Sequence, residues 1–187
     1  MTSTNTNTFT EASFSLTNRL ARILWQIVWK GLASWSPKPM HGFRAMLLSL
    51  FGAKVGRGAH IYPKVAIWAP WNLEIGEEAG IADGAILYSQ GKIIIGRRAV
   101  ISQGTHLCAG THDYEHSGMP LITKPITVGD YAWITAEAFV HGGVTIGDGA
   151  VIGARSVVTK DMPEWTVCAG HPCKPLKPRL MRPDKIS

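Results

Sequence analysis

The stretch from Val128 to Val158, VGDYAWITAEAFVHGGVTIGDGAVIGARSVV, carries an aliphatic residue at every sixth position. Neither the period of a helix nor the two-residue alternation of a strand produces this spacing. A period of six is typical of a parallel β-helix, in which each unit is a short flat strand followed by a turn. Three units form one triangular coil of about 18 residues, so equivalent aliphatic side chains stack and point inward.

The same phase extends toward the N-terminus and predicts roughly five coils within residues 53–170. Small residues near the strand ends suit the crowded corners, and glycines allow the turns. A β-sandwich is the ordinary alternative, but its strands vary in length and do not hold a six-residue phase. The further aliphatic positions are Val55, Ile61, Ile67, Ile75, Ile81, Leu87, Ile95, Ile101 and Leu107.

Three interruptions of the phase are informative. The spacing widens to 8 between Ile67 and Ile75 and between Leu87 and Ile95, and to 21 between Leu107 and Val128. The last gap contains the polar sequence GTHDYEHSGMP, which is rich in turn-forming residues. Residues 108–127 are therefore predicted to form a loop that leaves the coil and can reach a neighbour. Loops on a rigid scaffold often carry function.

Residues ahead of the coil have a different character. Residues 1–15 are rich in Thr, Ser and Asn, and predict a disordered start without a signal peptide. Residues 16–52 predict a helical segment, with helices over 16–35 and 41–51 separated by Pro37 and Pro39. Residues 171–187 form a basic C-terminal tail.

The first of these helices allows two roles. It can cap the open end of the coil, which the adjoining helix and prolines favour. It can also lie on a membrane, with Trp25 and Trp29 at headgroup depth and basic side chains facing anionic lipid. The two roles are compatible. The apolar stretch is interrupted by Arg22 and Lys30 and is too short to span a bilayer.

Charge and cysteine content limit the remaining options. The formal net charge of +6 favours anionic partners but does not select among them. The three cysteines have no paired spacing, which argues against a disulfide framework or a zinc site and favours a reducing cytoplasm.

Several passages resemble the maltose/galactoside O-acetyltransferase group of bacterial hexapeptide acyltransferases. They are the hexapeptide core, the THDYEH loop, PITVGDYAWI and GVTIGDGAVIGARSVVTKDMPEWTVCAGHPCK. The chain is most similar to the colanic-acid biosynthesis branch, which also matches IYPKVAIWAPWNLEIG. The resemblance implies an all-β, left-handed coil, although parallel crossovers are normally right-handed. It also implies a homotrimer with active sites between subunits. The cysteines and the first helix favour a location in the cytoplasm or peripherally at the inner membrane face, and we expect no nucleic-acid partner.

The resemblance also assigns the site residues. The loop histidine that acts as general base in the family matches His112, and imidazole suits that task near neutral pH. His112 is favoured over His116, although Glu115 and His116 could orient or replace the base. Asp113 replaces a proline of many relatives. The matching acceptor contact is Asp83. The positions implied for acetyl-CoA are Ala136, Ala154, Thr159, Lys160, Lys174 and Lys177, with Arg155 and Arg179 as further candidates.

The expected function is therefore acetyl-CoA-dependent O-acetylation of a sugar hydroxyl, by direct attack in a ternary complex and without a required metal. The setting would be exopolysaccharide or cell-surface polysaccharide biosynthesis, with a sugar or a lipid-linked saccharide as acceptor. Two alternatives stay open. One is a metalloenzyme like the gamma-class carbonic anhydrases, and the other is a non-catalytic β-helix. The histidines available for a metal are His106, His112, His116 and His141.

Overall fold

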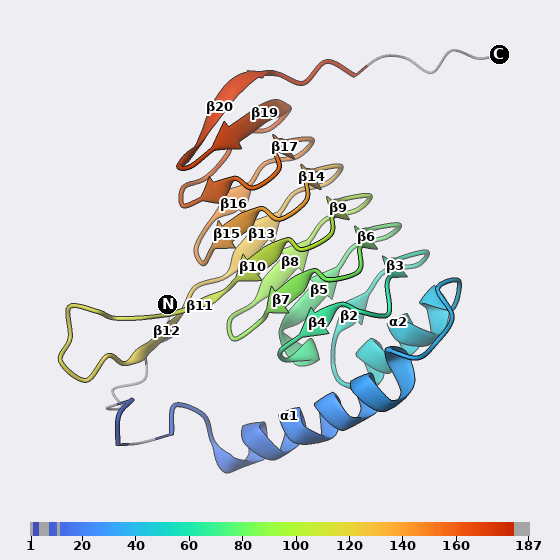
Figure 1. Cartoon of the computed structure of the whole chain (residues 1–187), viewed down its shortest axis with the longest axis vertical. Helices are drawn as coiled ribbons and strands as arrows, with labels where there is room; N and C mark the ends of the chain where they lie inside the picture. The colour runs from blue at the N-terminus through green and yellow to red at the C-terminus, as the bar shows by residue number, and fades with distance from the viewer. Residues whose placement is uncertain (1, 4–7, 11, 182–187) are drawn as a thin grey trace.

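The chain forms a parallel β-helix that passes through three sheets in turn (Figure 1). The structure is a computed structural model that describes residues 2–3, 8–10 and 12–181. Sheet 1 contains β2 (Lys54–Val55), β5 (Leu73–Ile75), β8 (Ile93–Ile95), β13 (Ile126–Val128) and β16 (Thr145–Ile146). Sheet 2 contains β3 (His60–Ile61), β6 (Gly80–Ile81), β9 (Val100–Ile101), β14 (Trp133–Ile134), β17 (Val151–Ile152), β19 (Thr166–Gly170) and β20 (Cys173–Pro178). Sheet 3 contains β4 (Ala66–Ile67), β7 (Ile86–Tyr88), β10 (His106–Cys108), β15 (Phe139–His141) and β18 (Val157–Val158).

The β-helix expected from the six-residue phase is confirmed. It has about six turns, one more than the rough count from the sequence, because β19 adds a further parallel rung beside β17. β20 then folds back antiparallel onto β19. Residues 171–187 were expected to form a basic tail, whereas Cys173–Pro178 of that segment form this strand. Residues 182–187 of that tail lie outside the described residues.

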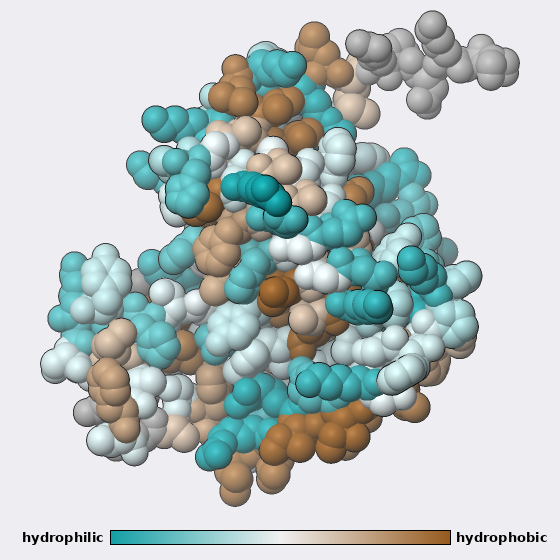
Figure 2. Space-filling model, in the orientation of Figure 1, coloured by the Kyte–Doolittle hydropathy of each residue, from teal (hydrophilic) through white to brown (hydrophobic). Residues whose placement is uncertain are grey.

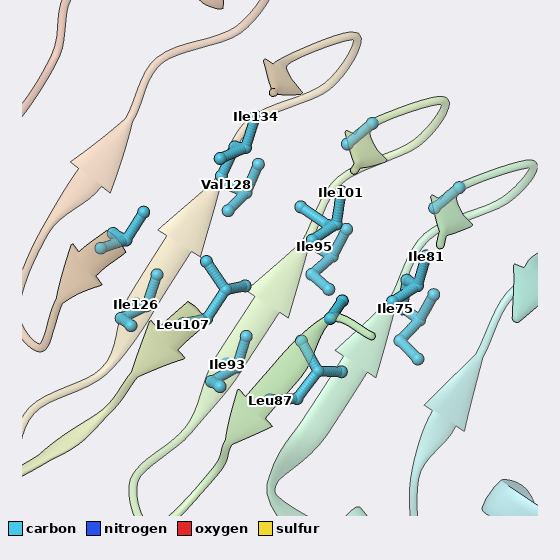
Figure 3. Packing of buried hydrophobic residues seen from close by; sticks show 14 of the residues in the cluster. Ile75, Ile81, Leu87, Ile93, Ile95, Ile101, Leu107, Ile126, Val128 and Ile134 are labelled. Carbon is cyan, nitrogen blue, oxygen red and sulfur yellow. The ribbon is translucent and has the colours of Figure 1, made fainter. Parts of the chain in front are cut away.

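The core is a column of aliphatic side chains inside the coil. The register pairs Ile81 with Ile101, Ile101 with Ile134, and Ile134 with Ile152. The last pair confirms the predicted stacking of residues that are 18 apart. All four side chains are fully buried. Figure 3 shows Ile81, Ile101 and Ile134 occupying the same interior position in successive rungs. Burial of each such side chain contributes about 1.5–3 kcal/mol, so the coil is stabilised along its whole length.

Close packing at the corners explains several glycines. A Cβ built on Gly76 would lie 2.5 Å from the backbone nitrogen of Arg97 in the next rung. The glycine is therefore required by the close approach of two turns. All three interruptions of the phase fall where the chain passes from sheet 3 to sheet 1. The first contains the short 3-10 helix η2 (Pro70–Asn72), and the third is the segment between β10 and β13.

Two helices cover the first rungs of the coil. α1 (Leu16–Val28) continues as the π-helical turn η1 (Trp29–Ala33), and α2 is His41–Leu50. Ser15 begins α1 by accepting a hydrogen bond from the Asn18 amide at 3.2 Å. Of residues 1–15, predicted to be disordered, residues 1, 4–7 and 11 lie outside the described residues. Thr2–Ser3 (β1) pairs with β12 (Leu121–Thr123).

The tryptophans of the helical segment face the coil. Trp25 Nε1 donates to the Ile67 carbonyl at 2.9 Å, and Trp29 Nε1 donates to the Val65 carbonyl at 2.8 Å. Both side chains are buried. The expectation that these tryptophans could lie at lipid headgroup depth is therefore wrong, because a buried indole needs an acceptor and finds one on the coil. Their contacts agree with a capping role for the helix.

Arg44 ties α2 to the coil from a fully buried position. Its Nε donates to the Ile61 carbonyl at 2.6 Å, and Nη1 donates to Ser36 Oγ at 2.6 Å and to the Pro37 carbonyl at 2.9 Å. Nη2 donates to the Lys38 carbonyl. One guanidinium thus donates to two carbonyls of the turn that joins the two helices and to one carbonyl of the coil.

We expect Arg44→Met to lower the free energy of unfolding by about 3 kcal/mol, because it removes four hydrogen bonds of a buried guanidinium, including the one that the Lys38 carbonyl accepts. Urea denaturation followed by circular dichroism measures the loss. Arg57→Met is the matched control, since Arg57 is exposed and lies 3.6 Å from Glu77. The control should change stability by less than about 0.5 kcal/mol. Equal losses in the two variants would contradict the structural role of Arg44.

Candidate active site

The long excursion is a two-stranded arm. β11 (Gly110–His112) and β12 (Leu121–Thr123) pair antiparallel, with His112 opposite Leu121. The arm leaves the coil after β10 and rejoins it at β13, at the corner between sheets 3 and 1. Figure 1 shows it projecting sideways from the coil. The pairing of the two strands fixes the direction in which the arm presents its side chains.

One ring nitrogen of His112 is held by a hydrogen bond. Its Nδ1 lies 2.7 Å from the carbonyl oxygen of Met119. A carbonyl can only accept, so Nδ1 carries the proton and Nε2 of the neutral ring is left as an acceptor. The side chain is half-buried and lines a groove of about 360 Å³ together with Tyr114, Lys124 and His141. The neutral ring of His112, which lines this solvent-accessible groove, can therefore accept a proton.

The carbonyl that orients His112 has a second donor. Thr8 Oγ1 donates to the same Met119 oxygen at 2.5 Å, and the Thr8 amide donates to the Gly118 carbonyl at 3.0 Å. Met119 has a φ of +42°, an uncommon value for a side chain of its size. Thr8 therefore holds the turn in which this carbonyl lies. No local pattern in the sequence signals that role, because Thr8 is far from the arm along the chain.

The other candidate histidines have different surroundings. His116 Nδ1 accepts the Gly118 amide at 3.0 Å, so this ring closes the turn of the arm. His106 contacts Tyr88 and Phe139 on the outside of sheet 3, and burial lowers its pKa. His141 Nδ1 lies 2.9 Å from the Gly142 carbonyl. Across the described ranges, no three His, Cys, Asp or Glu side chains gather as a metal-ligand set. Among the described residues, the metalloenzyme alternative therefore has no set of ligands that could hold a metal ion.

The cysteines are not arranged as nucleophiles. Cys108, Cys168 and Cys173 are free thiols. Burial raises the pKa of each, that of Cys168 to about 11. Nucleophilic attack requires the thiolate, which these environments disfavour near neutral pH.

The corner between sheets 2 and 3 brings together three of the predicted site residues. Each lies two positions after an inward isoleucine of sheet 2, so the register places all of them in equivalent positions. Successive rungs are about 4.8 Å apart, so members two rungs apart are separated by about 10 Å along the axis. We call this set, consisting of Asp83, Gln103, Ala136 and Ala154, the corner column.

The corner column presents two alanines, one amide and one carboxylate. The Arg155 amide donates to the Ala136 carbonyl at 3.0 Å, which links the last two members. Asp83 Oδ1 accepts the Lys64 amide at 2.9 Å. Beside the column, Arg155 Nε lies 2.6 Å from Glu137 Oε2. Arg155 is therefore already paired and is a poorer candidate for binding a phosphate.

The remaining predicted cofactor residues lie on two other elements. Thr159 and Lys160 follow β18 at the corner between sheets 3 and 1, and both are exposed. Lys174 and Lys177 are exposed on β20, opposite Ala169 and Val167. Arg179 instead donates through Nη1 to two carbonyls at 2.9 Å, which makes it a structural residue.

One chain does not bring His112 and the corner column together. Strand β15 lies between them. Ala136 of the column precedes this strand, and His141, at its end, lines the same groove as His112. The groove therefore opens at one edge of sheet 3, and the column lies at the other. Lys124 was not predicted as a site residue, and His141 was considered only as a possible metal ligand. Both line the groove because the coil places their corner beside the arm.

Comparisons with known proteins agree with this architecture. The family described as bacterial transferase hexapeptide (six repeats) matches residues 125–160. A relative from Escherichia coli K12, named "Putative colanic acid biosynthesis acetyltransferase WcaF", is 43% identical over 157 residues, covering 84% of this chain and 86% of that protein. The galactoside O-acetyltransferase of the same strain is 32% identical over 137 residues, covering 72% and 68%. A solved galactoside acetyltransferase in complex with coenzyme A has a TM-score of 0.82 at 26% identity, covering 90% and 86%.

The chain belongs to the hexapeptide-repeat acetyltransferases. The left-handed β-helix implied by the resemblance is the fold that these relatives share with it. The predicted enzyme class, an O-acetyltransferase that uses acetyl-CoA, is confirmed at this level.

The two arm histidines should differ in tautomer. In histidine-labelled protein, nitrogen-15 shifts of the neutral rings should show the proton on Nδ1 of His112 and on Nε2 of His116. The Met119 carbonyl requires a donor from the first ring, and the Gly118 amide requires an acceptor on the second. A proton on Nε2 of His112 would mean that its ring is not oriented as a base.

Proposed function

We propose that this enzyme transfers an acetyl group from acetyl-CoA to a sugar hydroxyl, with His112 as the general base. The observation that carries the proposal is the hydrogen bond from His112 Nδ1 to the Met119 carbonyl, which leaves Nε2 as an acceptor on a residue that lines a groove. A hydroxyl is a poor nucleophile, so its attack requires removal of its proton. A neutral imidazole in this tautomer suits that task near neutral pH.

The proposed reaction is direct transfer in a ternary complex. Bound acetyl-CoA supplies an acetyl group activated as a thioester. His112 Nε2 takes the proton of the acceptor hydroxyl as its oxygen attacks the thioester carbon, and the imidazolium returns that proton to the departing sulfur. The buried cysteines, with their raised pKa values, do not favour a covalent acyl-enzyme.

The corner column fits a long, flexible thioester ligand. Ala136 and Ala154 leave backbone groups approachable, and a pantetheine arm needs backbone amides and carbonyls more than side chains. Lys174 and Lys177 are exposed on β20 and form no ion pair within the described part of the chain. They would bind CoA phosphates as point charges. Thr159 and Lys160 would contribute from the neighbouring corner. Asp83, lower in the column, would bind an acceptor hydroxyl.

The proposal includes a homotrimer with each active site between two chains. It explains why His112 and the corner column lie at opposite edges of sheet 3. Exposed apolar side chains on the coil support such an interface. Val100 and Trp133 are neighbours in register and are 42% and 45% exposed. Association would cover this surface.

The proposed setting is cell-surface polysaccharide biosynthesis in the cytoplasm, with a sugar or a lipid-linked saccharide as acceptor and no nucleic-acid partner. The relative named for colanic acid biosynthesis supports this setting. No helix in the described ranges is long and apolar enough to cross a membrane. Peripheral membrane contact through residues 16–35 is considered separately below.

Replacement of His112 tests the base directly. We expect His112→Ala to lower kcat by about 10²–10⁴-fold with little change in the KM for acetyl-CoA, because only proton transfer is lost. Mass spectrometry of a panel of sugar acceptors incubated with acetyl-CoA measures the product. His116→Ala, on the same arm, should stay within about threefold of the wild type. Full turnover by the His112 variant would refute the assignment.

Subunit mixing tests the shared site. His112→Ala and Ala154→Trp should each be nearly inactive, the second because an indole fills the corner column. Co-expression of the two chains with different tags should restore about a quarter of the wild-type activity, because random pairing joins an intact arm with an intact column in that fraction of sites. Mixed assemblies as inactive as either parent would show that each site lies within one chain.

A further inference from the structure

The outer face of α1 is an exposed aliphatic stripe. Leu16, Leu20, Ile23 and Ile27 recur at helical spacing, and with Leu24 each is more than half exposed. Trp25 and Trp29 point the other way, into the coil. Figure 2 shows hydrophobic surface along the lower edge of the molecule, where α1 lies in Figure 1. The capping role of α1 therefore leaves this stripe uncovered.

The stripe is bordered by positive charge. A shallow groove of about 590 Å³ on this helix is lined by Arg19, Arg22, Ile23, Gln26, Ile27 and Lys30. Cations and aliphatic side chains thus lie beside one another on the same flank. A surface of this kind matches an anionic headgroup above an acyl chain.

The charge extends over the whole capped end of the coil. Residues 12–73 hold eight Lys and Arg and no Asp or Glu, a formal charge of +8 in a chain whose total is +6. Lys54 and Arg57 pair with Glu74 and Glu77 of the next rung, and Arg44 is buried. The others form no ion pair with any described residue, and they are Arg19, Arg22, Lys30, Lys38 and Lys64.

We propose that α1 docks the enzyme on an anionic lipid surface, with the stripe inserted at the level of the acyl chains and the basic flank against the headgroups. A second copy of the chain would cover the stripe less favourably, because it would bring two positively charged capped ends of the coil together. Docking rests on α1 alone and does not depend on the reaction catalysed.

Docking of this kind would hold the arm near the lipid. Thr8 bonds to the turn of the arm, and Leu16 begins α1 only eight residues later. Phe14 and Arg22 both contact Trp68 of the coil, which fixes the start of α1 against sheet 3. An acceptor carried on a lipid would then reach the groove of His112 without leaving the surface.

Vesicle co-sedimentation tests the proposal on the full-length protein. The wild type should bind vesicles of phosphatidylcholine with about a third phosphatidylglycerol, bind pure phosphatidylcholine more weakly, and lose the difference in high salt. Leu20→Gln/Ile27→Gln should weaken binding to the anionic vesicles by about tenfold or more. Leu176→Gln/Leu180→Gln is the matched control at the opposite end of the coil, where both leucines are exposed, and it should bind as the wild type does.

Three results would overturn the proposal. They are a wild type that ignores anionic vesicles, a stripe variant that binds as well as its control, and a wild-type assembly that the stripe variant disrupts in the absence of lipid. The stripe variant should retain acetyl transfer to a water-soluble acceptor. Loss of vesicle binding with intact transfer thus separates docking from the proposed reaction.

Discussion

The stacking of each rung directly on the next is the constraint on which the structure depends. Parallel hydrogen bonds hold the rungs about 4.8 Å apart, and an inward isoleucine or related residue fills the same position in each. Ile81, Ile101, Ile134 and Ile152 form one such line. Because the phase is fixed, every corner residue also lies directly over its equivalent in the previous turn. A regular core thereby produces a regular outer column, in which Asp83, Ala136 and Ala154 acquire a common surface.

The proposed base lies where this regularity is broken. The arm is the largest interruption of the phase, and it carries His112 away from the coil on a paired strand whose direction is fixed. The Met119 carbonyl then selects the tautomer, and Thr8 supports that carbonyl from the N-terminal segment. The arm and the column lie at opposite edges of sheet 3. Assembly of several chains is consequently part of the proposed chemistry, since it would bring a base from one chain to a cofactor on another.

The sequence predicts the repetitive part of this molecule far better than its contacts. A six-residue phase specifies which side chains point inward, and three interruptions identify the corner that carries the arm. Local patterns could not show that Thr8 bonds to Met119, because the two are 111 residues apart. The orientation of α1 was ambiguous for another reason, since both of its faces are apolar. Indole N–H groups that find carbonyls on the coil decide which face is buried. Two prolines, Pro175 and Pro178, obscured β20 as a strand.

A crystal structure of the assembled enzyme with coenzyme A bound is the measurement that tests the shared site most directly. We predict that the thiol lies beside Ala136 and Ala154 of one chain and faces Nε2 of His112 from a neighbouring chain. A thiol contacted by the column and the histidine of a single chain would contradict the two-chain site. So would an assembly in which every His112 faces bulk solvent.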